Sequence, residues 1–193
     1  MQRDSFDDDR SAIQIRIKGD ESATPLLIDT TNFLYDFNVA YEIARLATDR
    51  RYEQFRFSHY VFFRNGRPLS RPERLKVIRL REESPLELLA ELSAVTVGAL
   101  TAVWLLIQII EKAYNLKLNR RKLRAEVEKL ERDNKISAKE ARRAIDDLEQ
   151  HGLSHLPPDA ATAIEGATKR LTRTLIKIEK IELIAKRPND HDE

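Results

Sequence analysis

A long stretch without charge divides this chain and constrains what it can fold into. From Leu92 to Ile110 no side chain carries a charge, although 34% of the residues in the chain are charged. About twenty apolar residues are enough to cross a bilayer, and an apolar helix also packs in a protein core or against another copy of the chain. The segment is therefore a membrane span, a core helix or a surface for self-association.

A repeat of apolar residues favours self-association. Starting at Leu88, apolar or small residues recur at alternating steps of three and four, which is the spacing of a coiled-coil seam. The seam comprises Leu92, Val95, Ala99, Ala102, Leu106 and Ile109. Because the same register continues through Leu130, we expect one continuous helix over residues 84–135, opened by the capping sequence Ser84-Pro85-Leu86-Glu87.

Other features of the segment suit lipid. Ala94, Gly98 and Ala102 are spaced by four, which lets helices approach closely in a bilayer, and Trp104 suits either packed helices or an interface. A basic patch follows, suited to anionic headgroups or an acidic partner; it consists of Lys117, Arg120, Arg121, Lys122 and Arg124. Polar residues lower the hydrophobicity of the segment, however. Basic residues flank it on both sides, so the positive-inside rule selects no orientation in a membrane. We favour packing against protein and keep membrane insertion as the alternative.

The residues before this segment indicate a small α+β domain. Ile13–Lys18 alternate as in a half-buried strand, a helix is expected to end near Asp49, and strands are expected at Phe55–Phe63 and Leu75–Leu80. This order suggests an antiparallel sheet, for which a ferredoxin-like arrangement is our first choice. No counterpart of the second crossover helix and last strand is visible, so we expect the sheet to be incomplete or completed by a partner.

Helix start signals divide the rest of the chain. Ser137 opens a second capping box for a helix that ends near Gly152, and a third helix is expected from Asp159 to Lys186. Together with the long helix these would form a hairpin or bundle. The predicted organisation is an acidic tail at 1–10, an α+β interaction domain at 11–83, the long helix at 84–135, a helical hairpin extension at 136–187 and a tail at 188–193.

Composition and spacing argue against several kinds of chemistry. The chain has no cysteine, which removes thiol catalysis and cysteine-based zinc sites. Its five glycines lie far apart, which argues against a phosphate-binding loop. His151 and His155 are four residues apart, but Gly152 interrupts the helix between them and no third metal ligand follows. His59 has no visible serine or cysteine partner. We therefore expect no enzyme, no cofactor and no metal site.

An aromatic segment raises nucleic-acid binding as a further alternative. The sequence FRFSHYVFFR interleaves rings with basic side chains, as on sheets that stack RNA bases. However, the glycine-containing motif of such modules is missing, and strand alternation would turn several of these rings into a core. The formal net charge of the whole chain is +2, so bulk charge by itself predicts no partner. RNA binding is therefore the least favoured binding hypothesis.

One junction resembles an arrangement in uncharacterised bacterial proteins. The residues that carry the resemblance are RLKVIRLREESPLELLAEL and the later LLIQIIEKAYNLKLNRRKLRAEVEKL. In those proteins a small α+β domain precedes an apolar helix and a basic helix, and some are similar to the ferredoxin-like N-terminal domain of the death-receptor adaptor family. The resemblance covers about residues 70–130 and its motifs are structural. It implies an adaptor or effector role in bacterial conflict systems and assigns no active-site residue.

These observations lead to a functional hypothesis. We expect a non-enzymatic, self-assembling adaptor or scaffold, a cytoplasmic homo-oligomer that associates through its seam and binds another protein through its α+β domain. The alternative is a membrane-inserting or membrane-anchored effector in bacterial defence, located at the inner face of an anionic membrane. An RNA-binding adaptor is the second alternative.

Overall fold

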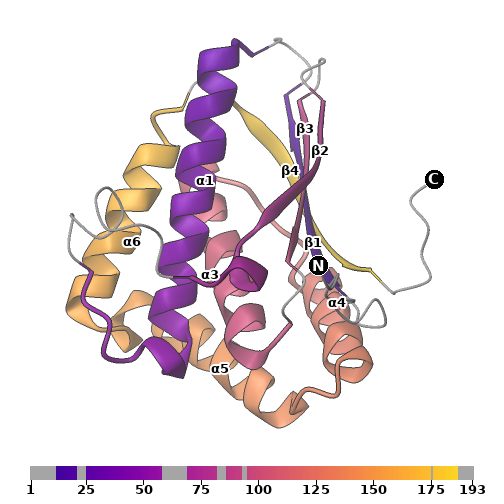
Figure 1. The fold of residues 1–193 in the computed structure, drawn as a ribbon, viewed down its shortest axis with the longest axis vertical. Coiled ribbons are helices and arrows are strands. Elements are labelled where there is room, and N and C mark those ends of the chain that lie inside the picture. Colours follow the sequence, from indigo (N-terminus) through magenta and orange to yellow (C-terminus); the bar gives the residue numbers. More distant parts are fainter. Residues whose placement is uncertain are drawn as a thin grey trace, which may run out of the picture.

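A four-stranded antiparallel sheet with helices packed beside it forms the protein, an α+β fold (Figure 1). The structure is a computed structural model, and it describes residues 12–20, 25–57, 69–81, 86–92, 95–174 and 176–186. The strands are β1 (Ala12–Gly19), β2 (Lys76–Arg81), β3 (Glu87–Leu92) and β4 (Ile178–Lys186), and they lie in the order β2-β3-β1-β4.

Strand β1 lies inside the sheet and pairs on both sides. Ile15 is opposite Ala90 of β3 and opposite Leu183 of β4. Ile13, Ile15 and Ile17 are all fully buried, because alternate residues of a strand point to the same face and this face lies against the helices. The predicted alternation at Ile13–Lys18 is therefore confirmed, and it marks the centre of the sheet.

The connections between the strands follow the ferredoxin-like pattern. Helix α1 (Leu27–Thr48) links β1 to β2, β3 follows β2 directly, and a helical segment links β3 to β4. All neighbouring strands are antiparallel and β1 lies between β3 and β4, which is the split β-α-β arrangement. The expectation of a sheet that is incomplete or completed by a partner is therefore wrong, because the C-terminal half of this chain supplies the second crossover and the last strand.

Four further helices form the second crossover. They are α3 (Val97–Tyr114), α4 (Arg120–Asp133), α5 (Ala138–His151) and α6 (Pro158–Leu171), accompanied by the short 3-10 turns η1 (Arg50–Tyr52), η2 (Arg71–Glu73) and η3 (Gly152–His155). Helix α3 packs against α1, α5 and α6, whereas α4 packs against β4. Most of the buried apolar residues in the described part of the chain form one core cluster that runs from the sheet through these helices.

The prediction of one helix over residues 84–135 is wrong. Residues 87–92 form β3, α3 begins only at Val97, and the Thr96 hydroxyl caps it by accepting a hydrogen bond from the Ala99 amide at 3.2 Å. Helix α3 ends at Asn115, which has a φ of 53°, a left-handed conformation that terminates helices. The helical interpretation of β3 failed because this strand is apolar on both faces and so lacks the period of two.

The prediction of a helix from Asp159 to Lys186 is also wrong in its second half. Helix α6 ends at Leu171 and residues 178–186 form β4. The helix expected between Ser137 and Gly152 is confirmed as α5. The sheet therefore draws strands from the predicted segments 11–83, 84–135 and 136–187, while the predicted tails at 1–10 and 188–193 lie outside the described residues.

Candidate functional site

The residues of the predicted seam lie in the core of this chain. Ala99, Ala102, Leu106 and Ile109 are on α3 and none is more than 3% exposed, and Trp104 is fully buried. Leu92 is buried in β3, Val95 is partly buried, and Ala94 lies outside the described residues. Among the described helices, α3 alone has the length and apolar character to cross a membrane; 61% of it is buried in the fold, as in the core helix of a soluble protein.

Gly98 faces a side chain of its own chain. A methyl group added at Gly98 would lie 2.7 Å from Oδ2 and 2.9 Å from Cβ of Asp49, which follows the last residue of α1. This is closer than carbon and oxygen atoms approach without displacement. The glycine therefore lets the end of α1 pass close to the start of α3.

Two members of the predicted basic patch, Arg120 and Arg124, are partly buried, whereas Lys117, Arg121 and Lys122 are exposed. The guanidinium groups of Arg120 and Arg124 lie over the ring of Trp104, at 5.5 and 5.9 Å from its centroid. Arg120 pairs with Glu111 of α3, and Arg124 pairs with Asp146 at 2.8 Å and with Glu149, both on α5.

These ion pairs tie α3, α4 and α5 together. Lys122 extends the network to the sheet, because its ammonium group lies 3.0 Å from Glu182 of β4. Lys117 and Arg121 are the exposed members of the patch that form no ion pair with a described residue.

The aromatic segment is only partly described. Phe55 and Phe57 lie in an irregular stretch after η1, partly buried, with their rings edge to face and centroids 5.1 Å apart. The predicted strand at Phe55–Phe63 is wrong at its first residues, and the remainder, including His59 and the Asn65-Gly66 turn, lies within the undescribed residues 58–68. Strand β2, which was expected to pair with this segment, pairs with β3 in the described part of the chain.

The described part of the chain contains no cluster of three or more residues suited to hold a metal ion. His151 is the exposed last residue of α5, and its Nδ1 lies 3.3 Å from the carbonyl oxygen of Asp147. His155 lies in η3, and its side chain is not described.

A buried cluster of charges lies at the end of α1. Arg45 is fully buried, and its Nη2 lies 3.1 Å from Asp49 Oδ2 and 3.7 Å from Glu73 Oε1. Nη2 also donates a hydrogen bond to the Thr96 hydroxyl at 3.1 Å. Arg51 reaches the same two carboxylates from the surface, at 2.7 and 2.6 Å. Two cations and two anions thus balance in one cluster, which connects α1, η2 and the start of α3.

The surroundings of this cluster lower the pKa of both of its carboxyl groups, Asp49 and Glu73. Burial by itself would raise the pKa of Asp49, but hydrogen bonds from Arg51 and the charges of Arg45 and Arg51 outweigh it, so the pKa of Asp49 is lowered. The pKa of Glu73 is lowered in the same way, by Ser70, Tyr52 and Arg51 acting against burial. Both carboxylates therefore remain ionised at neutral pH, which suits a structural ion-pair cluster.

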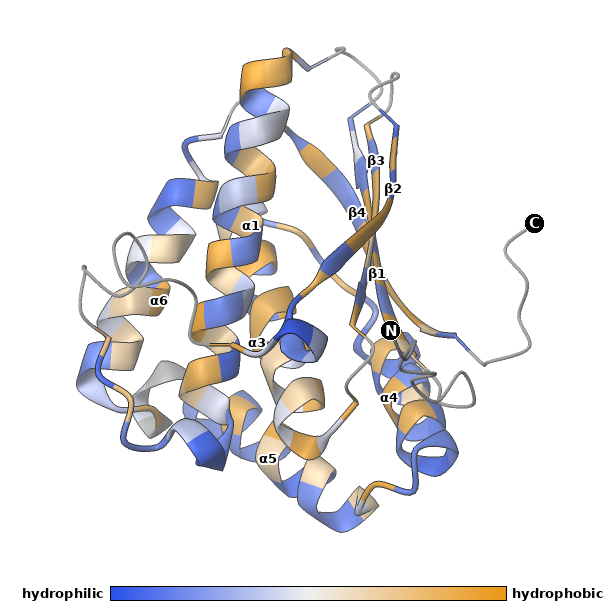
Figure 2. Cartoon of the chain, viewed as in Figure 1, coloured by the Kyte–Doolittle hydropathy of each residue, from blue (hydrophilic) through white to orange (hydrophobic). Residues whose placement is uncertain are grey.

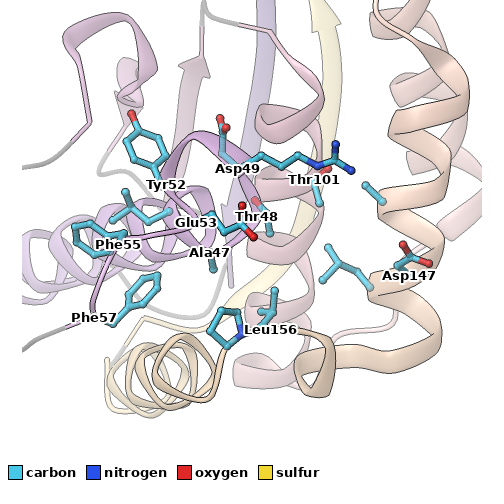
Figure 3. A pocket seen from close by; sticks show the side chains of 15 residues that line it. Ala47, Thr48, Asp49, Tyr52, Glu53, Phe55, Phe57, Thr101, Asp147 and Leu156 are labelled. Atoms are coloured by element: carbon cyan, nitrogen blue, oxygen red, sulfur yellow. The ribbon is translucent and has the colours of Figure 1, made fainter.

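A pocket opens beside this cluster. Its volume is about 400 Å³, and it lies between the end of α1, η1, α3, α5 and Leu156 (Figure 3). Aromatic residues Tyr52, Phe55 and Phe57 form part of its lining, together with Glu53 and Asp147. The pocket combines apolar surface with a few charged groups, which is the usual make-up of a small-molecule site.

A second candidate surface is the outer edge of β2. Among the described strands, β2 ends the sheet order and pairs with β3 alone, so half of its backbone groups face away from this ladder. Val77 and Ile78 are 55% and 42% exposed. The basic residues Arg79 and Arg81 lie on this strand, and neither forms an ion pair with a described residue.

The buried cluster, the pocket and the outer edge of β2 were not predicted from the sequence. One signal was present: Arg45 lies four residues after Tyr41 and four before Asp49, within the apolar face of α1. A charge at such a position requires a partner, and a carboxylate at i+4 can supply it. The pocket and the edge gave no local signal, because they arise from segments that are distant in sequence.

Comparisons of the chain with protein-family models, with curated proteins and with solved structures gave no match.

Proposed function

We propose that this protein is a non-enzymatic adaptor that takes an extended, acidic segment of a partner protein onto the free edge of β2. The observation that carries this proposal is a strand at the edge of the described sheet that combines exposed apolar side chains with two basic ones, Arg79 and Arg81, that form no ion pair with a described residue. Adding a strand to a sheet edge is a general mode of peptide recognition, in which backbone hydrogen bonds supply affinity and alternating side chains supply specificity. An adaptor role is also what the resemblance at the β2 to α4 junction implies.

The register of β2 defines the partner sequence. Lys76, Arg79 and Arg81 pair with Glu91, Leu89 and Glu87 of β3, so all three basic residues lie on one face of the sheet. Val77 pairs with Ala90 and therefore lies on the core face. A complementary strand would alternate acidic residues on the basic face with apolar residues beside Val77.

A second copy of β2 is a poor occupant of this edge. In an antiparallel pair of identical strands, the basic residues of the two copies would lie opposite or diagonal to one another on the same face. Like charges in such positions destabilise the pair. Charge complementarity therefore favours an acidic partner over self-pairing.

Self-assembly through α3 would require a change of fold. The seam of α3 already packs against α1, α5 and α6 of the same chain. An oligomer held together by this seam would form only if α3 left the core, which would expose its apolar side chains to water. We therefore place the contact with a partner protein at the edge of β2 and not on the seam of α3.

The test is to add the full chain in increasing amounts to labelled synthetic peptides and to measure binding by the fluorescence anisotropy of the label. The probes are a peptide that alternates Glu and Val, one of the same composition with Glu and Val in separate blocks, and one that alternates Lys and Val. We expect the alternating Glu/Val peptide to bind best, because only it matches both faces of β2. Replacement of Arg79 and Arg81 by Glu should weaken its binding about tenfold or more, since two attractions become repulsions.

The matched control reverses two exposed basic residues elsewhere. The double variant Lys117→Glu with Arg121→Glu changes the net charge by the same amount but leaves β2 intact. It should bind the Glu/Val peptide nearly as well as the original chain. Equal weakening by both double variants, or equal binding of the Glu/Val and Lys/Val peptides, would rule out recognition by β2.

A membrane-inserting effector is the second candidate, favoured by the length and apolar character of α3. The start of α1, which is apolar in Figure 2, adds Leu26 just before the helix and Leu27 and Ile28 in its first turn, which are 66%, 69% and 61% exposed. Flotation of the detergent-free protein on anionic liposomes separates the two candidates. Flotation that is lost when Leu27 is replaced by Asp would support membrane contact, whereas protein that stays at the bottom of the gradient would exclude it.

A further inference from the structure

We propose that the pocket at the end of α1 binds a small organic monocation, that is, an ammonium group attached to an apolar body. This site is separate from the edge of β2, so it does not depend on the adaptor function. It gives the protein a small-molecule ligand in addition to a protein partner. The proposal rests on the shape of the pocket, on its aromatic wall and on the balance of its charges.

The shape of the pocket suits a small molecule. A volume of about 400 Å³ lies in the range in which proteins bind drug-sized ligands. The aliphatic lining residues Leu46, Leu148 and Leu156 come from α1, α5 and the turn that follows η3. The pocket is therefore assembled by the tertiary fold, and it offers apolar surface to the body of a ligand.

One side of the pocket is aromatic. Figure 3 shows Tyr52, Phe55 and Phe57 together on one side, with Asp147 on the opposite side. The faces of aromatic rings carry partial negative charge and attract ammonium groups. A cation between this wall and Asp147 would therefore be attracted from both directions.

The charged groups of the pocket leave an excess of one negative charge. The lining contains three carboxylates, Asp49, Glu53 and Asp147, and one guanidinium, Arg50. Asp49 is already paired with Arg45 and Arg51. The carboxylates of Glu53 and Asp147 form no ion pair with a described residue, and neither does Arg50. Two carboxylates and one guanidinium that lack an ion pair with any described residue together attract a ligand with a single positive charge.

The first experiment compares three probes that have the same body and different charge. They are 2-phenylethylammonium, 2-phenylethanol and 3-phenylpropanoate, each titrated into the full chain and followed by the amide chemical shifts of the folded protein. We expect saturable shifts at Tyr52, Phe57 and Asp147 with the ammonium probe, weaker binding of the alcohol and the weakest binding of the carboxylate. Equal binding of the three probes, or no saturable shift with the ammonium probe, would overturn the proposal.

Substitutions with opposite expected effects test the charge balance. Asp147→Asn keeps the shape of the side chain and removes one attraction, so it should weaken ammonium binding about three- to tenfold. Arg50→Gln removes a repulsion and should strengthen ammonium binding. Glu140→Gln, an exposed position at the other end of α5, is the matched control and should have no effect.

The uncharged alcohol probe distinguishes a lost charge attraction from a change in the shape of the pocket. If Asp147→Asn weakened the binding of the alcohol as much as that of the ammonium probe, the substitution would have altered the shape of the pocket, and recognition of a cation would be refuted. The same conclusion would follow if Arg50→Gln weakened ammonium binding. Preserved alcohol binding with a selective loss of ammonium binding is the result that we expect.

Discussion

Arg45 is a fully buried guanidinium on the apolar face of α1, held by Asp49 and Glu73. Replacement of Arg45 by Met should lower the free energy of unfolding by about 3 kcal/mol, because removing one member of a buried ion-pair cluster leaves charges without compensation. Arg51 contacts the same carboxylates, but its side chain is 57% exposed. Arg51→Met should therefore cost about 1 kcal/mol or less. Urea unfolding of both variants provides the test, and equal losses would contradict the central role of Arg45.

The same cluster predicts a dependence of stability on pH. The pKa values of Asp49 and Glu73 are lowered in the folded chain, so the stability they contribute is present above their unfolded pKa values and is lost as pH falls through the folded ones. Between about pH 5 and pH 3 the loss of unfolding free energy should be smaller in the double variant Asp49→Asn with Glu73→Gln than in the original chain. Urea titrations at several pH values would show the difference.

Two carboxyl groups elsewhere have a raised pKa, so their contribution to stability changes with pH in the opposite direction. The contribution of Asp49 and Glu73 is therefore measured by comparing variants. Burial raises the pKa of Asp36 and of Glu131, although Arg170 and Arg142 oppose the effect. The exposed pair Glu140→Gln with Glu165→Gln serves as the matched control. If this control flattened the pH profile as much as the cluster variant, the assignment of the pH dependence to Asp49 and Glu73 would be wrong.

Two helical glycines make a matched pair. Alanine in a helix interior is normally about 1 kcal/mol more favourable than glycine. At Gly166 of α6 no atom lies within 4 Å of an added methyl group, so Gly166→Ala should stabilise the protein by about 0.5–1 kcal/mol. At Gly98 the methyl group would collide with Asp49, which Arg45 and Arg51 hold in place, so Gly98→Ala should destabilise it by about 2 kcal/mol. Thermal unfolding would reveal the opposite signs.

At the scale of elements, the spacing of apolar residues along each segment decided which strands and helices could be predicted. Ile13, Ile15 and Ile17 alternate with polar residues, and β1 was predicted on that basis. Residues 87–92 (ELLAEL) lack this alternation because Leu88, Leu89 and Ala90 are all buried. In β4 the step of three between Ile178 and Ile181 mimics a helix, whereas pairing with β1 makes the segment a strand. Tertiary pairing thus overrode local preference in both strands.

The interpretation of α3 as a core helix gives a direct prediction. Leu106→Ala removes a fully buried side chain and should lower the free energy of unfolding by about 3 kcal/mol, through lost burial and the cavity that remains. Because the lost contacts lie within one chain, the unfolding midpoint should not change with protein concentration. A midpoint that rises over a hundredfold increase in concentration would instead indicate that the seam joins copies of the chain.

At the scale of the whole molecule, the sheet depends on distant parts of the chain. A fragment of residues 1–83 contains β1, α1 and β2 but neither of the strands that pair with β1. We therefore expect this fragment to show no cooperative unfolding, whereas the full chain unfolds in one transition. Circular dichroism during thermal unfolding would distinguish them. A cooperative transition in the fragment would show that the predicted segment 11–83 is an independent domain.

The pairing of β1 with β4 also has a consequence for how the protein is made. Ala12 pairs with Lys186, so β1 emerges from the ribosome long before its second neighbour has been synthesised. Until then one side of the central strand offers free backbone groups beside Ile13, Ile15 and Ile17, which is the situation in which nascent chains associate wrongly. The newly made chain would therefore depend on chaperones for most of its synthesis, and its slow step would be the late insertion of β4.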